Sequence, residues 1–361
     1  MARYTYDLGV ARARAAALKQ ALPQATVLYA VKANGHPAVV RALAGSCDGL
    51  DVASEGELLL ATGAGARRVV LSGPGKTTSF LGAGVRCGAT VNVESVTELY
   101  RIAALNMPLA VTLRVNRTHP LLPGTHAMTG EPSQFGIDEA ALGDAVSVAL
   151  SVPGLELLGW HLHAASNNLD VKAHNAFIAD ALEWSVSAAA WFGVTLRQVN
   201  LGGGFGVDYE GTRVFDPAEL VIDAPPGVEV VVEPGRWLVA DAGWYEVEVV
   251  DLKRSHGRWF AIVRGGTHHF RLPAAWGYSH PFTVLPCDPW EHSWPRPVVR
   301  DVEVDVAGEL CTPRDVLTRG QHVSRLRVGD VLRYAKTGAY GWDISAHQYL
   351  RHRSPEFVIL S

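Results

Sequence analysis

The stretch Tyr29-Ala30-Val31-Lys32-Ala33-Asn34 places a lysine at the end of an apolar run that begins at Thr26. An Asn-Gly-His-Pro turn at residues 34–37 follows, so we predict a buried strand that ends at Lys32. Ligands of α/β proteins bind at the carboxyl ends of the strands. A lysine desolvated there can act as a nucleophile that forms a Schiff base with an aldehyde cofactor. The simpler interpretation is a lysine that only marks the end of a strand.

The first two thirds of the chain alternate between helical and strand-like patterns. We expect helices at residues 8–22, 37–44, 138–149, 170–191 and 216–221, and after Ser54, Thr77 and Ser95. We expect strands at residues 26–31, 49–52, 68–71, 89–93, 109–115, 157–163, 197–201 and 228–232. Eight strands, each preceded by a helix, match a (β/α)8 barrel in number and length. The alternative is an open doubly wound sheet, but its glycine-rich turn follows the first strand, whereas the glycine triplet here lies late in the chain.

The pattern changes after Trp237, where strand-like alternation replaces helical periodicity. Apolar runs at residues 244–250, 258–263, 298–306 and 331–334 are separated by Gly and Pro turns, which is typical of a mostly-β domain. We therefore predict a barrel domain at residues 1–235 and a C-terminal β domain at residues 236–361.

Composition excludes several classes of function. The 361 residues are 48% hydrophobic, which is ample for a large core, and the net charge of -4 leaves no basic excess for nucleic acid or a membrane surface. We find no signal peptide or membrane-spanning run, so we expect a cytoplasmic protein. The four cysteines form no CxxC pair and no HExxH motif is present, so we predict neither disulfides nor a metal ion.

Four short motifs fall at the predicted carboxyl ends of barrel strands. Lys32 ends the first strand, and His163 ends the sixth. Gly202-Gly203-Gly204-Phe205-Gly206 follows the seventh strand, and Glu233-Pro234-Gly235-Arg236 follows the eighth. Each motif alone is weak, because a glycine triplet is common in tight turns. Since the carboxyl ends of the strands meet on one face of a barrel, the four together predict one site.

The chemistry of these motifs predicts pyridoxal 5'-phosphate (PLP) as the cofactor. Successive glycines let backbone N–H groups approach a phosphate without interference from a Cβ, and Arg236 adds a guanidinium fork. Glu233 can keep a pyridine nitrogen protonated, which strengthens an electron sink. His163 can lie flat on the ring, and Lys32 can hold the aldehyde.

Seven segments of this chain resemble the motifs of the fold-type III PLP-dependent decarboxylases, in the same order. They are YAVKAN at 29–34, DVAS at 51–54, HAAS at 163–166, GGGFG at 202–206, EPGR at 233–236, CTPRD at 311–315 and GAYG at 338–341. That family contains the ornithine, arginine and diaminopimelate decarboxylases and shares its barrel with alanine racemase. The resemblance covers nearly the whole chain and implies an alanine racemase-like barrel. It also implies a β domain that contributes to the active site and to a dimer.

The resemblance further implies a role for each matching residue. The implied catalytic residues are Lys32, His163 and Cys311. The implied cofactor-binding residues are Lys32, Asp51, Arg114, His163, Ser166, Gly203, Gly204, Glu233, Arg236 and Tyr340. Cys311 comes from the other subunit in this family and steers protonation after carbon dioxide leaves. The implied assembly is a homodimer with two shared sites.

The departures from the family pattern concern the substrate. Thr312 stands where basic amino acid decarboxylases carry Asp and diaminopimelate decarboxylases carry Glu, so a distal amine lacks its usual partner there unless Asp315 substitutes. The segment at residues 266–282 resembles the substrate loop of diaminopimelate decarboxylases but is enriched in histidine. Arg271, with His268, His269 and His280, suits a carboxylate-rich substrate, although a β-domain loop with solvated histidines is the simpler interpretation.

These features are most similar to the decarboxylases of carboxylate siderophore biosynthesis. Members of that subgroup decarboxylate an amino acid joined to citrate, such as a citryl-diaminopropionate conjugate, and this choice rests on resemblance alone. The alternatives are a diaminopimelate or basic amino acid decarboxylase, an amino acid racemase on the same fold, and a non-catalytic homologue that acts by binding a protein. Alanine racemases place an arginine opposite the pyridine nitrogen, so Glu233 argues against a racemase.

Overall fold

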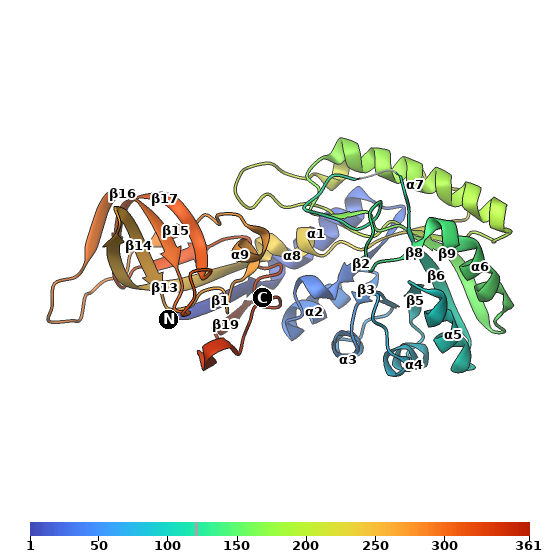
Figure 1. Cartoon of the computed structure of the whole chain (residues 1–361), viewed down its shortest axis with the longest axis horizontal. Coiled ribbons are helices and arrows are strands. Elements are labelled where there is room, and N and C mark those ends of the chain that lie inside the picture. The colour runs from blue at the N-terminus through green and yellow to red at the C-terminus, as the bar shows by residue number, and fades with distance from the viewer. Residues whose placement is uncertain (120–121) are drawn as a thin grey trace. The chain divides into compact units, whose positions relative to one another are not determined.

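The computed structural model describes residues 1–119 and 122–361 and divides the chain into two compact units (Figure 1). The barrel unit consists of Arg12–Val207 and Arg213–Leu238, and the β unit consists of Met1–Ala11, Asp208–Thr212 and Val239–Ser361. The sequence-based boundary at residues 235/236 differs from this division because the first eleven residues belong to the β unit.

The barrel unit contains eight parallel strands that close on themselves. Their order is β2-β3-β4-β5-β6-β9-β11-β12, with β5 paired to β6 and β12 paired back to β2. The strands are β2 (Ala25–Ala30), β3 (Gly49–Val52), β4 (Val69–Leu71), β5 (Thr90–Val93), β6 (Leu109–Asn116), β9 (Leu155–His161), β11 (Gln198–Asn200) and β12 (Glu229–Val232). The prediction of a (β/α)8 barrel is therefore confirmed.

Helices cover the outside of these strands, as Figure 1 shows for α2 to α7. They are α1 (Leu8–Ala21), α2 (Pro37–Ala44), α3 (Glu55–Gly63), α4 (Thr78–Arg86), α5 (Val96–Ala104), α6 (Leu142–Ser151), α7 (Val171–Phe192) and α8 (Arg236–Val239). Ser54, Thr77 and Ser95 cap α3, α4 and α5, because each side chain accepts a hydrogen bond from a backbone N–H of the first turn. At the start of α3 the Glu57 side chain folds back as in a capping box, but its Oε2 accepts a hydrogen bond from Ala53 N, the residue before the cap, at 2.6 Å.

Two predicted helices differ from the structure. The helix expected from residue 138 begins as a 3-10 turn, Glu139–Ala141, and becomes α-helical only at Leu142. The helix expected at residues 216–221 is only the 3-10 turn Pro217–Glu219, after which Leu220 is extended. A segment this short does not recover the cost of helix nucleation from its own hydrogen bonds.

The β unit is built on one mixed sheet with the path β15-β18-β13-β14-β16-β17, and β1 (Ala2–Asp7) joins β13 to β19 (Glu356–Leu360). The remaining strands are β13 (Gly243–Ser255), β14 (Arg258–Val263), β15 (Thr283–Leu285), β16 (Val298–Ala307), β17 (Val316–Arg327) and β18 (Val331–Tyr334). The sequence analysis missed β1 because its pairing partners lie more than 200 residues away. It missed β17 because polar residues interrupt its apolar pattern.

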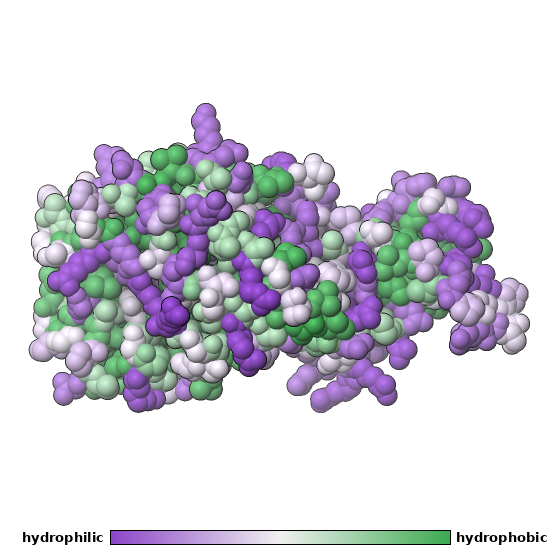
Figure 2. Space-filling model, turned by 180° about the vertical axis from the view of Figure 1, so that it is seen from behind, coloured by the Kyte–Doolittle hydropathy of each residue, from purple (hydrophilic) through white to green (hydrophobic). Residues whose placement is uncertain are grey.

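The described residues contain no helix that is long and apolar enough to cross a membrane. On the face seen in Figure 2, hydrophilic side chains are interspersed with small apolar areas.

The centre of the barrel unit provides a test of its packing. Leu28 on β2, with Val70 and Val231, forms a fully buried core cluster. We expect Leu28→Ala to lower the free energy of unfolding by about 2–5 kcal/mol, because the substitution leaves a cavity in a packed core. Leu59→Ala is the matched control, since Leu59 on α3 is 69% exposed, and should change stability by less than about 0.5 kcal/mol. Urea unfolding followed by circular dichroism measures both, and equal effects would contradict this packing.

Candidate active site

Lys32 lies at the carboxyl end of the barrel strands. It belongs to the 3-10 turn Val31–Ala33, which follows β2 directly, so the strand ends one residue before the end of the predicted range 26–31. Its Nζ lies 3.2 Å from Oδ2 of Asp51 on β3. The Asp51 side chain is buried, whereas that of Lys32 is 46% exposed. The carboxylate therefore holds a lysine that still has room to react.

Glu233 follows β12 and is buried among hydrogen-bond donors from neighbouring strands. Its Oε1 accepts hydrogen bonds from Asn200 Nδ2 at 2.6 Å and Asn92 Nδ2 at 3.2 Å. Its Oε2 lies 3.4 Å from His161 Nε2. Asn92 is itself fixed, because it donates to Ser72 Oγ and its Oδ1 accepts from Thr112 Oγ1.

The two buried carboxyl groups of this site have opposite pKa shifts. Burial raises the pKa of Asp51, and the negative charge of Glu233 raises it further, against the opposing effect of Lys32. Burial alone would also raise the pKa of Glu233, but His161, Lys32 and Asn200 outweigh burial and lower this pKa well below its ordinary value. Glu233 is therefore a stable carboxylate, and Asp51 gains a proton more readily than an ordinary aspartate. Divergent pKa values of this kind are typical of functional sites.

His163 lies against the glycine triplet. Its Nδ1 accepts a hydrogen bond from the backbone N–H of Gly203 at 3.1 Å. Burial lowers the pKa of His163 well below its usual value, and the positive charges of Arg114 and Lys32 lower it further. The imidazole is therefore neutral at pH 7, as a ring that stacks on another ring requires.

Only glycine fits at the three positions of the triplet, because a Cβ at any of them would overlap neighbouring atoms. A Cβ on Gly202, whose φ is 67°, would overlap the His163 ring, and a Cβ on Gly203 would overlap the carbonyl oxygen of Glu233. Gly204 has a φ of 97°, and its Cβ would lie 2.6 Å from the carbonyl oxygen of Ala165. The loop therefore requires glycine for close approach of the backbone. The half-buried Ser166 follows Ala165, in β10 (Ala165–Ser166), and the buried Arg236 begins α8.

Arg114 on β6 is held by a buried ion pair. Its Nη1 lies 2.9 Å from Glu94 Oε1, and its guanidinium packs on the Phe135 ring at 4.7 Å. Burial tends to raise the pKa of Glu94, but Arg114 and Lys76 lower it on balance. Among the described residues, Arg114 Nη2 has no hydrogen-bond partner, so one donor of this fixed guanidinium can serve a ligand.

The predicted residues of the C-terminal region belong to the β unit. Cys311 is exposed, on a loop that runs from Gly308 to Asp315. Asp315 is buried, and its two oxygens accept hydrogen bonds from Thr267 N, Thr267 Oγ1 and Leu310 N. The suggestion that Asp315 substitutes for a substrate-binding acid is therefore wrong, because its carboxylate fixes the loop that carries Cys311.

The three histidines of the 266–282 segment face inward. His269 is bonded through both ring nitrogens, to Tyr245 Oη and to the carbonyl oxygen of Arg353. His280 is likewise bonded to Tyr278 Oη and to the carbonyl oxygen of Ala335. His268 is fully buried as well. The interpretation as a loop with solvated histidines is therefore wrong, because these rings are buried inside the β unit. A role of His268 and His280 in substrate binding stays a prediction.

The other predicted residues of the β unit are more accessible. Arg271 is exposed at the start of α9 (Leu272–Trp276), and Thr312 is half-buried, with its Oγ1 3.4 Å from Arg314 N. Tyr340 is half-buried and has a φ of 53°. A non-glycine residue with positive φ is uncommon and often marks a functional position.

Sequence reasoning missed the residues around Glu233. Asn92 interrupts the apolar run of β5, Asn200 ends β11, and His161 ends β9. A single polar residue inside an apolar strand must find a partner when it is buried. Such a polar residue in an apolar strand was the sequence feature that could have identified these residues. Their side chains point to one another across the barrel interior.

The chain matches the family model described as "Pyridoxal-dependent decarboxylase, pyridoxal binding domain" over residues 8–240. It is 35% identical to the 2-[(L-alanin-3-ylcarbamoyl)methyl]-2-hydroxybutanedioate decarboxylase of Staphylococcus aureus, over 99% of this chain and 94% of that protein. It is 30% identical to the diaminopimelate decarboxylase of Aquifex aeolicus, over 99% of this chain and 86% of that protein. The crystal structure of diaminopimelate decarboxylase from Helicobacter pylori in complex with L-lysine is similar, with a TM-score of 0.87 and 25% identity over 100% of this chain and 92% of that chain.

The glycine triplet provides a direct test of the cofactor site. We expect Gly203→Ala to raise the Kd for PLP at least about tenfold, or about 1.4 kcal/mol, because the new Cβ displaces the loop from Glu233. Gly75→Ala is the matched control, since a Cβ there meets no atom within 4 Å. Fluorescence titration of the cofactor-free protein with PLP measures both. An unchanged Kd in Gly203→Ala would contradict a phosphate site at this loop.

Proposed function

Because the chain belongs to the pyridoxal-dependent decarboxylases, we propose that its substrate is an amino acid joined to a citrate-like dicarboxylate. The protein is a PLP-dependent amino acid decarboxylase with an alanine racemase-like fold. The substrate, the roles of individual residues and the assembly are the proposal.

The residues at the carboxyl end of the barrel fit PLP. Gly203, Gly204, Ser166 and Arg236 would hold the phosphate, on the loops that bind phosphate in such barrels. The Asp51 carboxylate forms an ion pair with the Lys32 ammonium at 3.2 Å. This contact would position Lys32 to bind the cofactor aldehyde. The unpartnered Arg114 Nη2 and the buried nitrogens of His161, which lack hydrogen-bond partners within the described part of the chain, fit a polar ligand at this site.

Bound PLP supplies an electron sink for the electron pair that the leaving carboxylate leaves behind. Glu233 would keep a proton on the pyridine nitrogen, since its own pKa is too low for it to take that proton away. Neutral His163 would cover the cofactor and exclude water from it. Lys32 would exchange a proton with the substrate amine at its Nζ, with Asp51 as its partner. We assign the final protonation of carbon to Cys311, at its Sγ.

The observation that carries the substrate proposal is the loop beside Cys311. Thr312 has no charge, and the carboxylate of Asp315 is fully used by Thr267 and Leu310. Neither residue can bind the distal amine of lysine, ornithine or diaminopimelate. The name of the staphylococcal relative instead describes an amino acid linked through an amide to a hydroxybutanedioate. Exposed Arg271 suits the carboxylates of such a substrate, and a role in siderophore biosynthesis follows from that substrate.

We also propose a cytoplasmic homodimer in which Cys311 and Tyr340 complete the active site of the partner. Cys311 is exposed on an anchored loop, as a residue that acts on another subunit must be. The four cysteines are free thiols, which suits a reducing compartment.

Carbon dioxide release tests the substrate. The PLP-loaded protein is assayed with citryl-diaminopropionate, meso-diaminopimelate, ornithine, arginine and lysine. We expect release from the conjugate alone. Release from meso-diaminopimelate or a basic amino acid at a similar rate would sink the proposal, and inverted amino acid without carbon dioxide would favour the racemase alternative.

Arg271 provides a sharper test of the conjugate. We expect Arg271→Ala to raise the KM for the conjugate about tenfold, because a charge-assisted hydrogen bond contributes about 1.5–3 kcal/mol. Arg300→Ala is the matched control, since Arg300 is an exposed arginine on β16. An equal KM in both variants would exclude Arg271 from substrate binding.

Mixing two inactive variants tests the shared site. We expect Lys32→Ala and Cys311→Ala each to lose most activity, and an equal mixture to recover about a quarter of the wild-type rate. Random exchange places half of the chains in mixed dimers, each with one intact site of two. If subunit exchange is verified and the mixture still recovers no activity, Lys32 and Cys311 act within one chain.

A further inference from the structure

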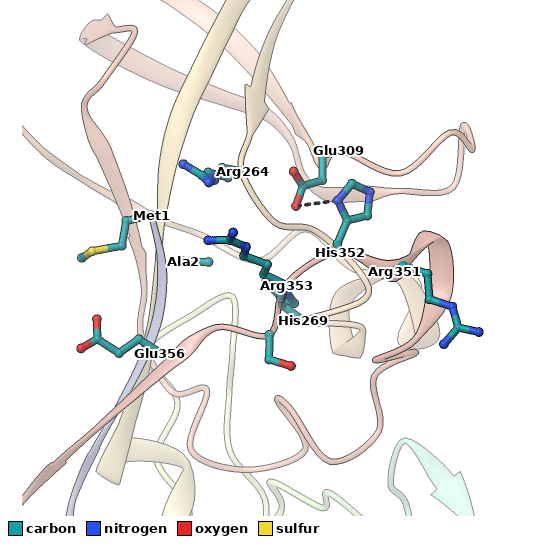
Figure 3. A pocket seen from close by; sticks show the side chains of 10 residues that line it. Met1, Ala2, Arg264, His269, Glu309, Arg351, His352, Arg353 and Glu356 are labelled. Carbon is teal, nitrogen blue, oxygen red and sulfur yellow. Dashed lines mark hydrogen bonds and ion pairs between the residues drawn. The ribbon is translucent and has the colours of Figure 1, made fainter.

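Three side chains with metal-binding atoms converge in the β unit, and none of them is assigned above to PLP binding or catalysis. His268, Glu309 and His352 each offer one ligand atom, and these atoms all lie within 4.8 Å of one another. They come from three separate segments: His268 follows β14, Glu309 follows β16, and His352 precedes β19. Figure 3 shows Glu309 and His352 facing each other in a pocket of about 520 Å³.

His268 is the exception among the buried histidines of its segment. His269 and His280 have both ring nitrogens hydrogen-bonded. His268 is 0% exposed, and neither of its ring nitrogens has a hydrogen-bond partner among residues 1–119 and 122–361. Its Nε2 lies 3.4 Å from Glu309 Oε1 without the alignment of a hydrogen bond. A buried polar atom without a hydrogen-bond partner lowers the stability of the fold. A ligand bound to His268 Nε2 would remove this cost.

Two of the three spacings between the ligand atoms are close to those of a tetrahedral metal site, and the third is within 4.8 Å. Glu309 Oε1 lies 3.4 Å from His268 Nε2 and 3.6 Å from His352 Nδ1. Two ligands of a tetrahedral zinc ion lie about 3.3–3.4 Å apart when the bonds to zinc are about 2.0–2.1 Å long. An ion placed between these atoms therefore requires only small shifts of the side chains.

We propose that His268, Glu309 and His352 bind one zinc ion. Two imidazoles and one carboxylate are a ligand set that zinc uses in sites with an open fourth position, and imidazole favours zinc over magnesium or calcium. The sequence analysis predicted no metal because the three ligands lie 41 and 43 residues apart and form no local motif.

We place the open coordination position of the ion on the side of the pocket. The charge of the residues that line this pocket then determines which fourth ligand binds. Arg264 and Arg353 line the same pocket as Glu309 and His352. Their guanidinium groups disfavour a second cation and favour an anion, so the fourth ligand is a water, a hydroxide or a small carboxylate. The ion would also cross-link the loop that begins beside Glu309 and carries Cys311 to two distant segments. Its role is therefore to position that loop.

Metal binding is measured on the full-length, tag-free, PLP-loaded protein after treatment with a chelator. We expect titration with zinc chloride to give one ion per chain by calorimetry. We expect cobalt(II) to give the visible absorption of a tetrahedral site at the same stoichiometry. Binding of zinc should also raise the melting temperature, because the ion binds only the folded state.

Variants separate this site from other zinc-binding groups. His352→Ala and Glu309→Gln alter half-buried side chains and should fold, and each should weaken zinc binding at least about a hundredfold. His322→Ala is the matched control, since His322 is exposed on β17 of the same unit, and should bind as tightly as the wild type. Carbon dioxide release in each variant is measured separately, because the zinc site does not rest on the substrate proposal.

The absence of stoichiometric zinc binding would overturn the proposal. So would zinc binding that His352→Ala and Glu309→Gln leave unchanged, because the ion would then sit on other groups. His268→Ala is a third variant whose circular dichroism spectrum is checked first, since His268 is fully buried.

Discussion

The buried carboxylate of Glu233 is the constraint around which the barrel is organised. An ionised carboxylate in an apolar interior is stable only when hydrogen-bond donors and positive charge surround it. The donors come from Asn92 on β5 and Asn200 on β11, and the neighbouring ring comes from His161 on β9. Four strands therefore converge on one carboxyl group. The closure of the barrel is what brings them together, since β5 and β12 are far apart in an open sheet of the same strands.

The glycine triplet depends on the same carboxylate. Gly203 packs so closely on the backbone of Glu233 that no Cβ fits, and its N–H is bonded to His163. The residue that we assign to the pyridine nitrogen and the glycines that we assign to the phosphate are thus in direct contact. Burial and the positive charges of Arg114 and Lys32 lower the pKa of His163, and His161 and Lys32 lower the pKa of Glu233. Geometry and protonation are therefore set by one set of contacts rather than by independent residues.

The sequence predicts what local pattern controls. Most of the eight barrel strands are predominantly apolar, and Ser54, Thr77 and Ser95 are N-caps that mark the starts of their helices. Lys32, His163 and Glu233 were found because each follows such a run. What depends on distant partners was missed. Strand β1 is defined by β13 and β19, and the donors to Glu233 are ordinary asparagines until the barrel closes. The inward orientation of His280 depends on Tyr278 and the backbone at Ala335, which no sequence pattern encodes.

The carboxyl groups of Glu309 and Asp315, near the two ends of the Cys311 loop, are stabilised in different ways. Asp315 is buried but satisfied, because three donors from Thr267 and Leu310 surround it. Oε1 of Glu309 instead lies 3.4 Å from Nε2 of His268 and 3.6 Å from Nδ1 of His352. An imidazole nitrogen without a proton is an acceptor and repels a carboxylate oxygen. A divalent cation would satisfy the oxygen and both nitrogens at once. The loop is thus held by hydrogen bonds at Asp315 and, in our proposal, by metal coordination at Glu309.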